Sequence, residues 1–352
     1  MLRKKFHKNK ASRENWDVKI GVTAAVSLLF LGNVLAEANA SDCSLKRLAS
    51  VDLIVDKWVL LPVTVGQNHV FMSLTTSSSY NLISEEGVTS LGLSKRRLPS
   101  AVSIQILREQ AKEYVAVDWI QIGNTRMQNV DFIVDVLSDN YPLRPTGAVV
   151  ASLGMLMFGK LDLELDLSHK KLGLYSQDHC AGKAVYWSDH ASAIPLYRGQ
   201  AGDFYFVVEL NGRKLEAGIS TLLEYSSLEE AASRSLFGID MQSPGIERKA
   251  TNGGTRAFLK VVTITAQGIA ITNADVMLQS TWEGCKLNLN KPATHAVGFD
   301  GCLSRYPLLL GRDVLEKLHL YWATGEKVLY VTSADASRDA GPATSSSSTG
   351  TQ

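Results

Sequence analysis

The chain repeats one order of sequence features twice, and this repetition constrains its fold more than any other property. In each copy a strand-like hairpin runs into a loop rich in serine, threonine and leucine. A short helix-like stretch, a pair of strands and an apolar strand that ends in Leu-Gly then follow. An internal repeat in which each unit is a complete set of strands predicts two similar lobes that pack together.

The individual elements carry local signals. Asn211-Gly212, between two apolar runs, is typical of a tight hairpin turn, and Gly66–His69 occupies the same place in the first copy. Serine followed by glutamate predicts a capped helix start in each copy. The expected strands and helices are hairpins at 58–71 and 204–219, helices at 84–93 and 227–239, strand pairs at 115–134 and 261–278, and closing segments at 152–175 and 309–331.

The composition allows a large core and argues against a polyanionic partner. Hydrophobic residues make up 45% of the 352 residues, and charged residues make up 20%. The net charge is only +1, whereas nucleic-acid binders usually carry a concentrated basic face. We therefore expect no nucleic-acid partner.

The first 40 residues are typical of an export signal. A basic segment precedes the apolar run Ile20–Ala36, and Ala38 and Ala40 form an A-x-A cleavage pattern. We expect cleavage after Ala40 and an exported protein, either periplasmic or secreted. The alternative is an uncleaved anchor, because the run is close to the minimum length that spans a bilayer. Only this segment is expected to contact a membrane.

The repeat sets the expected domain limits: a signal at 1–40, a first lobe at 43–176, a linker at 177–192, a second lobe at 193–332 and a disordered tail at 333–352. Four cysteines are present, and an even number in an exported protein indicates two disulfides. Three pairings are possible. We favour Cys43–Cys180 and Cys285–Cys302, because each pair then lies within one lobe.

The two loops carry a family resemblance. Leu74-Thr75-Thr76 and Ile219-Ser220-Thr221 each follow an apolar strand and precede further serine or leucine residues. Together with the later Leu-Gly segments they resemble retropepsin-like, pepsin-clan aspartic proteases, in particular a bacterial, exported, two-lobed branch. The family loop reads Asp-Thr-Gly-Ala. The resemblance implies a mostly β fold of two retropepsin-like β-barrel lobes (the acid-protease fold), with short helices and an inter-lobe cleft.

The same resemblance implies roles for the loop residues. Leu74 and Ile219 fall at the aspartate, Thr75 and Ser220 at the threonine whose hydroxyl bonds across the lobes, and Thr76 and Thr221 at the glycine. A β-branched residue at the glycine should narrow the centre of the cleft. The remaining positions expected to line the binding site are Ser77, Ser78, Leu222, Gly154 and Gly311.

This alignment removes the chemistry of the family. Its hydrolysis uses one aspartate from each lobe, one acting as base on a water and the other as acid. No aspartate occurs between Lys57 and Val117 or between Phe204 and Ile239. We therefore predict an inactive pseudoprotease, without a metal or cofactor, that binds an extended peptide or a protein.

Two alternatives remain open. One is an active endopeptidase that uses other carboxylates. The other is a scaffold or regulator of an active relative. Asp162, Glu164 and Asp166 alternate along one strand and should share a solvated face, and His319 is expected within a strand. The other candidate carboxylates are Asp131, Asp135, Glu224 and Asp313.

Overall fold

Strands dominate the chain and form two barrels and one sheet that both halves share. The computed structural model describes residues 43–100, 102, 104–106, 109–134, 149–199, 202–251, 254–280 and 306–336. The predicted signal segment, Asp135, Cys285 and Cys302 lie outside these ranges, as does the predicted tail beyond residue 336.

The first barrel closes from six strands in the order β3-β4-β11-β5-β10-β9, with β3 pairing back onto β9. Side chains alternate inward and outward, so that Val59, Leu61, Val63 and Val65 of β3 are all buried. Strands β2 and β6 flank the barrel, and β7 pairs with β8. The elements are β2 (Ile54–Val55), β3 (Val59–Val65), β4 (Asn68–Thr75), β5 (Leu82–Ile83), α1 (Glu85–Ser90), β6 (Lys95–Arg97), β7 (Gln105–Ile106), β8 (Glu109–Gln110), β9 (Glu113–Ile122), β10 (Thr125–Val134), β11 (Val149–Gly154) and the 3-10 helix η1 (Met155–Phe158).

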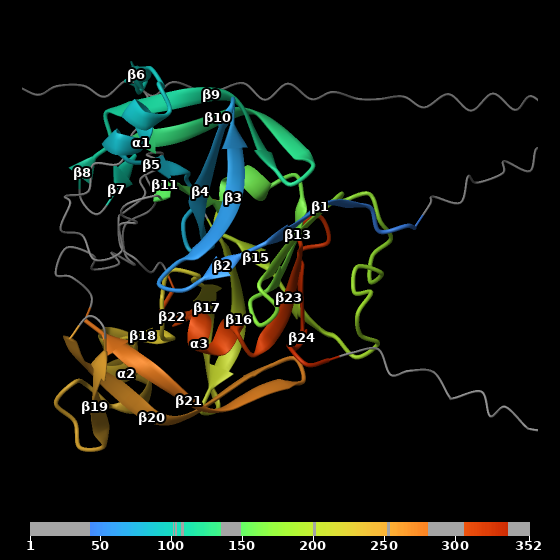
Figure 1. Ribbon diagram of the computed structural model, residues 1–352. Coiled ribbons are helices and arrows are strands. Elements are labelled where there is room, and N and C mark those ends of the chain that lie inside the picture. The colour runs from blue at the N-terminus through green and yellow to red at the C-terminus, as the bar shows by residue number, and fades with distance from the viewer. Residues whose placement is uncertain are drawn as a thin grey trace, which may run out of the picture. The chain divides into compact units, whose positions relative to one another are not determined.

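The second barrel repeats this order as β16-β17-β22-β18-β21-β20, closed by β16 against β20 (Figure 1). The parallel pairing of β4 with β11 recurs as β17 with β22. The prediction of a mostly β fold with two similar barrels is therefore confirmed. The elements are β15 (Tyr197–Arg198), β16 (Phe204–Leu210), β17 (Arg213–Ile219), β18 (Ser227–Glu229), α2 (Glu230–Phe237), β19 (Ile246–Thr251), β20 (Gly254–Ala266), β21 (Ile269–Gln279), β22 (Leu308–Leu310) and α3 (Arg312–Leu315).

A six-stranded sheet, which we call the shared sheet, joins the two halves in the order β1-β13-β12-β23-β24-β14. Its central pair is β12 from the first half and β23 from the second. Figure 1 shows β13, in green, near β23 and β24, in red. The strands are β1 (Arg47–Asp52), β12 (Asp162–Asp166), β13 (Lys171–Tyr175), β14 (Ser192–Pro195), β23 (Leu318–Ala323) and β24 (Val328–Ser333).

The two early helices follow the predicted capping chemistry in part. The hydroxyl of Ser84 accepts a hydrogen bond from the Gly87 amide at the start of α1. Helix α2 ends at Gly238, whose φ of 69° is the left-handed conformation that glycine adopts readily. The predicted start of this helix was wrong, because residues 227–229 form β18. Their backbone pairs with β21 and β22 instead.

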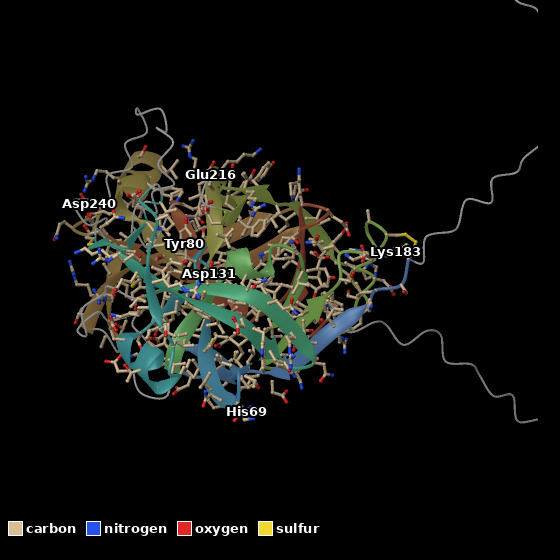
Figure 2. The ribbon with its side chains drawn as sticks, turned by 90° about the horizontal axis from the view of Figure 1, so that it is seen from above. His69, Tyr80, Asp131, Lys183, Glu216 and Asp240 are labelled. Atoms are coloured by element: carbon tan, nitrogen blue, oxygen red, sulfur yellow. A yellow bond between two sulfur atoms is a disulfide. The ribbon has the colours of Figure 1, made fainter. Side chains whose placement is uncertain are left out.

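The Cys43–Cys180 disulfide is present and ties the segment before β1 to the connector between the halves. Figure 2 shows it at the edge of the molecule near Lys183. Among the residues that the structure describes, no helix is long and apolar enough to cross a bilayer.

Candidate functional site

Two loops that follow equivalent strands meet across the two halves. Loop 1 comprises residues 76–81, after β4, and loop 2 comprises residues 220–226, after β17. Each strand lies beside a parallel neighbour that leads into a glycine: β11 ends at Gly154, and Gly311 directly follows β22. The duplicated topology therefore brings the two serine- and threonine-rich segments to the same place.

Four hydrogen bonds made by Thr76 and Thr221 join the two halves in a nearly symmetric arrangement. The Thr76 hydroxyl donates to the Ile219 carbonyl at 2.9 Å and accepts from the Thr221 amide at 3.1 Å. The Thr221 hydroxyl donates to the Leu74 carbonyl and accepts from the Thr76 amide at 3.2 Å. All four are buried, so they fix the two backbones against each other.

This pattern corrects the sequence alignment by one residue. We predicted that Thr75 and Ser220 would make the cross-lobe bonds, but Thr76 and Thr221 make them. If the bonding threonine follows the aspartate, as the resemblance implies, the aspartate positions fall on Thr75 and Ser220. Two successive hydroxyl residues, Thr75-Thr76 and Ser220-Thr221, follow Leu74 and Ile219, so the motif alone could not decide between these registers.

Leu74 and Ile219 are core residues. Leu74 is 0% exposed and Ile219 is 5% exposed, and both belong to the main hydrophobic cluster. Successive side chains in a strand point to opposite faces. A shift of the alignment by one residue therefore moves the aspartate position from a side chain that points into the core to the next one, which points to the other face. Neither Leu74 to Asn81 nor Ile219 to Ser226 contains an aspartate.

The corrected positions carry hydroxyl groups only. Thr75 Oγ1 is buried and has no hydrogen-bond partner in the described structure. Ser220, 1% exposed, lies with its hydroxyl 3.0 Å from that of Ser77 in loop 1. Neither residue has a side chain that ionises in the range where a carboxylate does. In the same register, Ser77 and Leu222 fall where the resemblance places the glycine, instead of the predicted Thr76 and Thr221.

The remaining predicted site residues are mostly involved in packing. A Cβ at Gly154 would lie 2.4 Å from the Tyr80 carbonyl oxygen, and one at Gly311 would lie 2.4 Å from the Tyr225 carbonyl carbon. These positions need glycine because a loop backbone crosses them closely. Ser78 donates to the Tyr80 carbonyl at 3.1 Å.

Sequence reasoning missed the side chains that support the two glycines. The Asn81 amide oxygen accepts from the Gly154 amide, and the Ser226 hydroxyl accepts from the Gly311 amide, both at 2.9 Å. Asp313 in turn accepts from the Ser226 amide and hydroxyl at 2.7 and 2.9 Å. Burial raises the pKa of Asp313, and these hydrogen bonds oppose the rise only in part. The only sequence signal for this role is that Asn81 and Ser226 are the last residues of their loops.

The three strand carboxylates proposed as substitutes lie away from the loops. Asp162, Glu164 and Asp166 lie on β12 in the shared sheet, between 0% and 8% exposed, so the predicted solvated face is wrong. A strand between β13 and β23 has no solvent edge, and histidine and tyrosine side chains cover these acids. Asp131 and Glu224 are exposed.

The shared sheet contains a second polar group of buried residues, around Glu164. His319 Nε2 lies 2.8 Å from its Oε1, Tyr186 also donates to it at 2.8 Å, and Tyr175 donates to Oε2. Burial would raise the pKa of Glu164, but the bonds from His319, Tyr175 and Tyr186 outweigh it and lower this pKa. His319 lies in β23, as predicted, and the Trp187 ring stacks on it at 3.8 Å.

A further contact between the halves comes from Arg312, which is 8% exposed and bonds the Asp56 carbonyl through Nη1. In the described part of the chain, no group of three or more His, Cys, Asp or Glu residues is arranged to hold a metal ion.

Comparisons with known proteins give structural neighbours only. No family model matches the chain, and no curated protein sequence matches it. The crystal structure of an aspartic proteinase from Irpex lacteus is 9% identical, covers 82% of this chain and 98% of its own, and has a TM-score of 0.47. Basic 7S globulin from soybean is 8% identical, with 84% and 98% coverage and the same TM-score.

Proposed function

We propose that this chain is a catalytically silent protein with an acid-protease-like fold, which binds an extended peptide or a protein partner between its lobes. The observation that carries the proposal is the register of the cross-lobe bonds. Thr76 and Thr221 hold the two loops together, and Thr75 and Ser220 precede them. The places where the family carries its two acids therefore hold hydroxyl groups.

Hydroxyl groups at these places cannot perform the reaction. Activation of water needs a base whose proton affinity suits the working pH, and polarisation of the peptide carbonyl needs a partner acid. A pair of carboxyls supplies both, because repulsion between their charges keeps one protonated. Threonine and serine stay neutral and protonated across that range, so a water beside them keeps its ordinary reactivity.

The retained features suit binding. The barrels and the cross-lobe bonds hold both loops in fixed positions, which lowers the entropy lost when a ligand is bound. Among the described strands, β2 and β6 are the ends of the first barrel sheet and β15 and β19 are the ends of the second, and extended peptides commonly add to such edges. A protein segment in extended conformation is therefore the ligand class we favour.

We also propose that the protein acts outside the cytoplasm. The Cys43–Cys180 disulfide supports this, since structural disulfides persist mainly in oxidising compartments. It favours export without distinguishing a periplasmic from a secreted protein.

The test is a cleavage assay with a peptide library over the acidic and neutral range, with and without pepstatin. We expect no pepstatin-sensitive cleavage. The same library, immobilised, should retain the protein, and Ser220→Leu should weaken retention by crowding the loop. Pepstatin-sensitive hydrolysis by the wild type would refute the proposal, and so would a library that retains neither form.

A further inference from the structure

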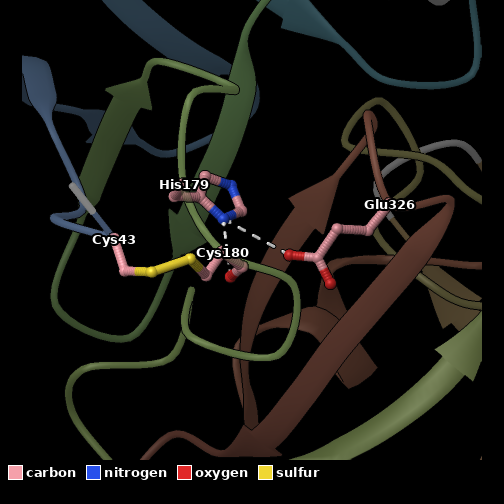
Figure 3. The surroundings of a disulfide bond; sticks show 4 residues. All are labelled: Cys43, His179, Cys180 and Glu326. Carbon is pink, nitrogen blue, oxygen red and sulfur yellow. Dashed lines mark hydrogen bonds and ion pairs between the residues drawn. A yellow bond between two sulfur atoms is a disulfide. The ribbon is translucent and has the colours of Figure 1, made fainter. Parts of the chain in front are cut away.

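His179 lies between two carboxylates that belong to different halves of the chain. Its Nε2 is 2.6 Å from Asp162 Oδ2 on β12, and its Nδ1 is 3.4 Å from Glu326 Oε1, in the turn between β23 and β24. The side chains of His179, Asp162 and Glu326 are 2%, 1% and 13% exposed. Figure 3 shows the ring beside the Cys43–Cys180 disulfide, with Glu326 on the other side.

Both ring nitrogens face acceptors only. Besides Glu326, Nδ1 lies 3.3 Å from the Cys180 carbonyl oxygen. A neutral imidazole carries one N–H and one lone pair. If Nε2 holds the proton, the Nδ1 lone pair faces Glu326; if Nδ1 holds it, the Nε2 lone pair faces Asp162 at 2.6 Å. Only the doubly protonated ring gives each carboxylate a donor.

The other groups around Asp162 and Glu326 do not replace the positive charge of the His179 ring. Asp162 also accepts from the Thr324 amide and hydroxyl at 2.9 and 3.1 Å and from the Tyr321 hydroxyl at 3.3 Å. Glu326 Oε2 accepts from the Gly182 amide and the Tyr330 hydroxyl. Glu326 Oε1 is buried without a hydrogen bond, and the imidazole at 3.4 Å is its ion-pair partner. No lysine or arginine in the described ranges pairs with Asp162 or Glu326.

We propose that His179 is a proton-dependent latch: its charged ring joins the connector to the strand after the first barrel and to the turn after the second, and loss of the proton loosens this junction. The latch goes beyond the proposed ligand-binding function and does not depend on it. Its neighbour Cys180 holds the start of β1, so the latch and the disulfide secure the same short stretch of the connector.

The direction of the pH effect follows from the geometry. Burial alone would lower the pKa of His179, but the hydrogen bond to Asp162, the Cys180 carbonyl and the charge of Glu326 outweigh it and raise the pKa above 6.5. A group whose pKa is raised by folding stabilises the fold fully below its unfolded pKa, and this stabilisation is lost as pH rises through the folded value. The junction should therefore weaken on the alkaline side.

The experiment measures the unfolding equilibrium of the oxidised protein in denaturant between pH 5.5 and 8.5. For the wild type the folding constant should fall with rising pH, by about tenfold for each unit by which folding raises the pKa. His190→Gln is the matched control, because His190 is an exposed histidine of the same connector, and it should keep the full pH dependence. His179→Gln should be less stable at pH 5.5 and should lose most of that dependence.

His319 sits beside Glu164 and Asp166, so His319→Gln separates its contribution. The proposal is overturned if His179→Gln keeps the wild-type pH dependence, or if only His319→Gln removes it. If His179→Gln does not fold, ring ¹⁵N signals of the wild type decide the question. Both nitrogens of His179 should carry protons at pH 6, and a neutral ring there would contradict the latch.

Discussion

The loops and the shared sheet, two of the places where the halves of this chain meet, use different polar groups. At the loops the contact consists of hydroxyls and backbone amides, with Thr76 and Thr221 at its centre. In the shared sheet it consists of three buried carboxylates with histidine and tyrosine partners. The chain therefore buries three acids in the shared sheet, where fixed donors satisfy them, and joins the loops through the hydroxyls of Thr76 and Thr221 instead.

The largest effect should come from an aspartate at position 74, one residue before the position that the cross-lobe bonds indicate. Leu74→Asp puts a charge into the barrel core, and we expect a loss of about 5 kcal/mol or more, because a buried unpaired charge is among the costliest substitutions. Thr75→Asp is the matched control and should cost clearly less in denaturant unfolding. If Thr75→Asp cost more stability than Leu74→Asp, the register deduced from the cross-lobe bonds would be wrong.

Removal of the disulfide should be the next largest effect. Cys43 and Cys180 are 137 residues apart in sequence, and on the chain-entropy model a loop of this size is worth about 4–5 kcal/mol. Cys43→Ala/Cys180→Ala should lose most of this amount. Reduction of the wild type should reproduce the loss, and equal stability of the oxidised and reduced wild type would contradict the expectation.

Acid should weaken the shared sheet. Burial would raise the pKa values of Glu164 and Asp166. Their hydrogen bonds outweigh burial and lower these pKa values below the ordinary 4.5 and 3.8. A lowered pKa gives stability that is present above the unfolded value and is lost as pH falls through the folded one. Glu164→Gln should cost roughly 2 kcal/mol at pH 7, and its stability should fall less steeply than that of the wild type below pH 4.5. Hydrogen exchange at β12 and β23 would locate the change.

The cross-lobe bonds should give a smaller and coupled effect. Thr76→Val and Thr221→Val each remove a buried hydroxyl from two hydrogen bonds, and each should cost about 1–3 kcal/mol. Because their partners belong to one network, the double variant should lose less than the sum, with a coupling of roughly 0.5–3 kcal/mol. Thr64→Val, which removes an exposed hydroxyl contact to His69, serves as the control. If the losses of the two single variants added up to that of the double variant, the two loops would not stabilise each other.

The smallest effect should be a gain in stability, whereas the preceding substitutions cause a loss. Thr75 Oγ1 is buried without a partner, so Thr75→Val removes an unsatisfied polar atom and keeps the shape. We expect no loss and a gain of up to about 1 kcal/mol. A loss above that size would show that the hydroxyl has a partner.

The sequence predicted the features that depend on local patterns. The Asn211-Gly212 turn, with φ of 47° and 77°, joins β16 to β17 as expected. The favoured Cys43–Cys180 pair is present and ties the start of the first lobe to the connector that follows it. The order of strands in both barrels follows from the repeat, because each copy must bury the same alternating faces.

What the sequence could not predict depends on contacts between distant segments. Two adjacent hydroxyl residues in each loop fit the family pattern in either register, and only the bonds between Thr76 and Thr221 choose one. The alternating acids of β12 look like a solvated strand until β23 is placed against them. His179 gave no signal at all, since its two carboxylate partners come from residues 162 and 326.

A carboxyl titration of the Thr75→Asp/Ser220→Asp variant tests the central claim most directly. If Thr75 and Ser220 hold the paired positions, the two introduced carboxyls lie close together and repulsion keeps one protonated well above the ordinary aspartate value of about 3.9. Carboxyl ¹³C signals should then titrate in two coupled steps. Two independent carboxyls that both titrate near 3.9 would contradict the assignment of these residues to the catalytic places.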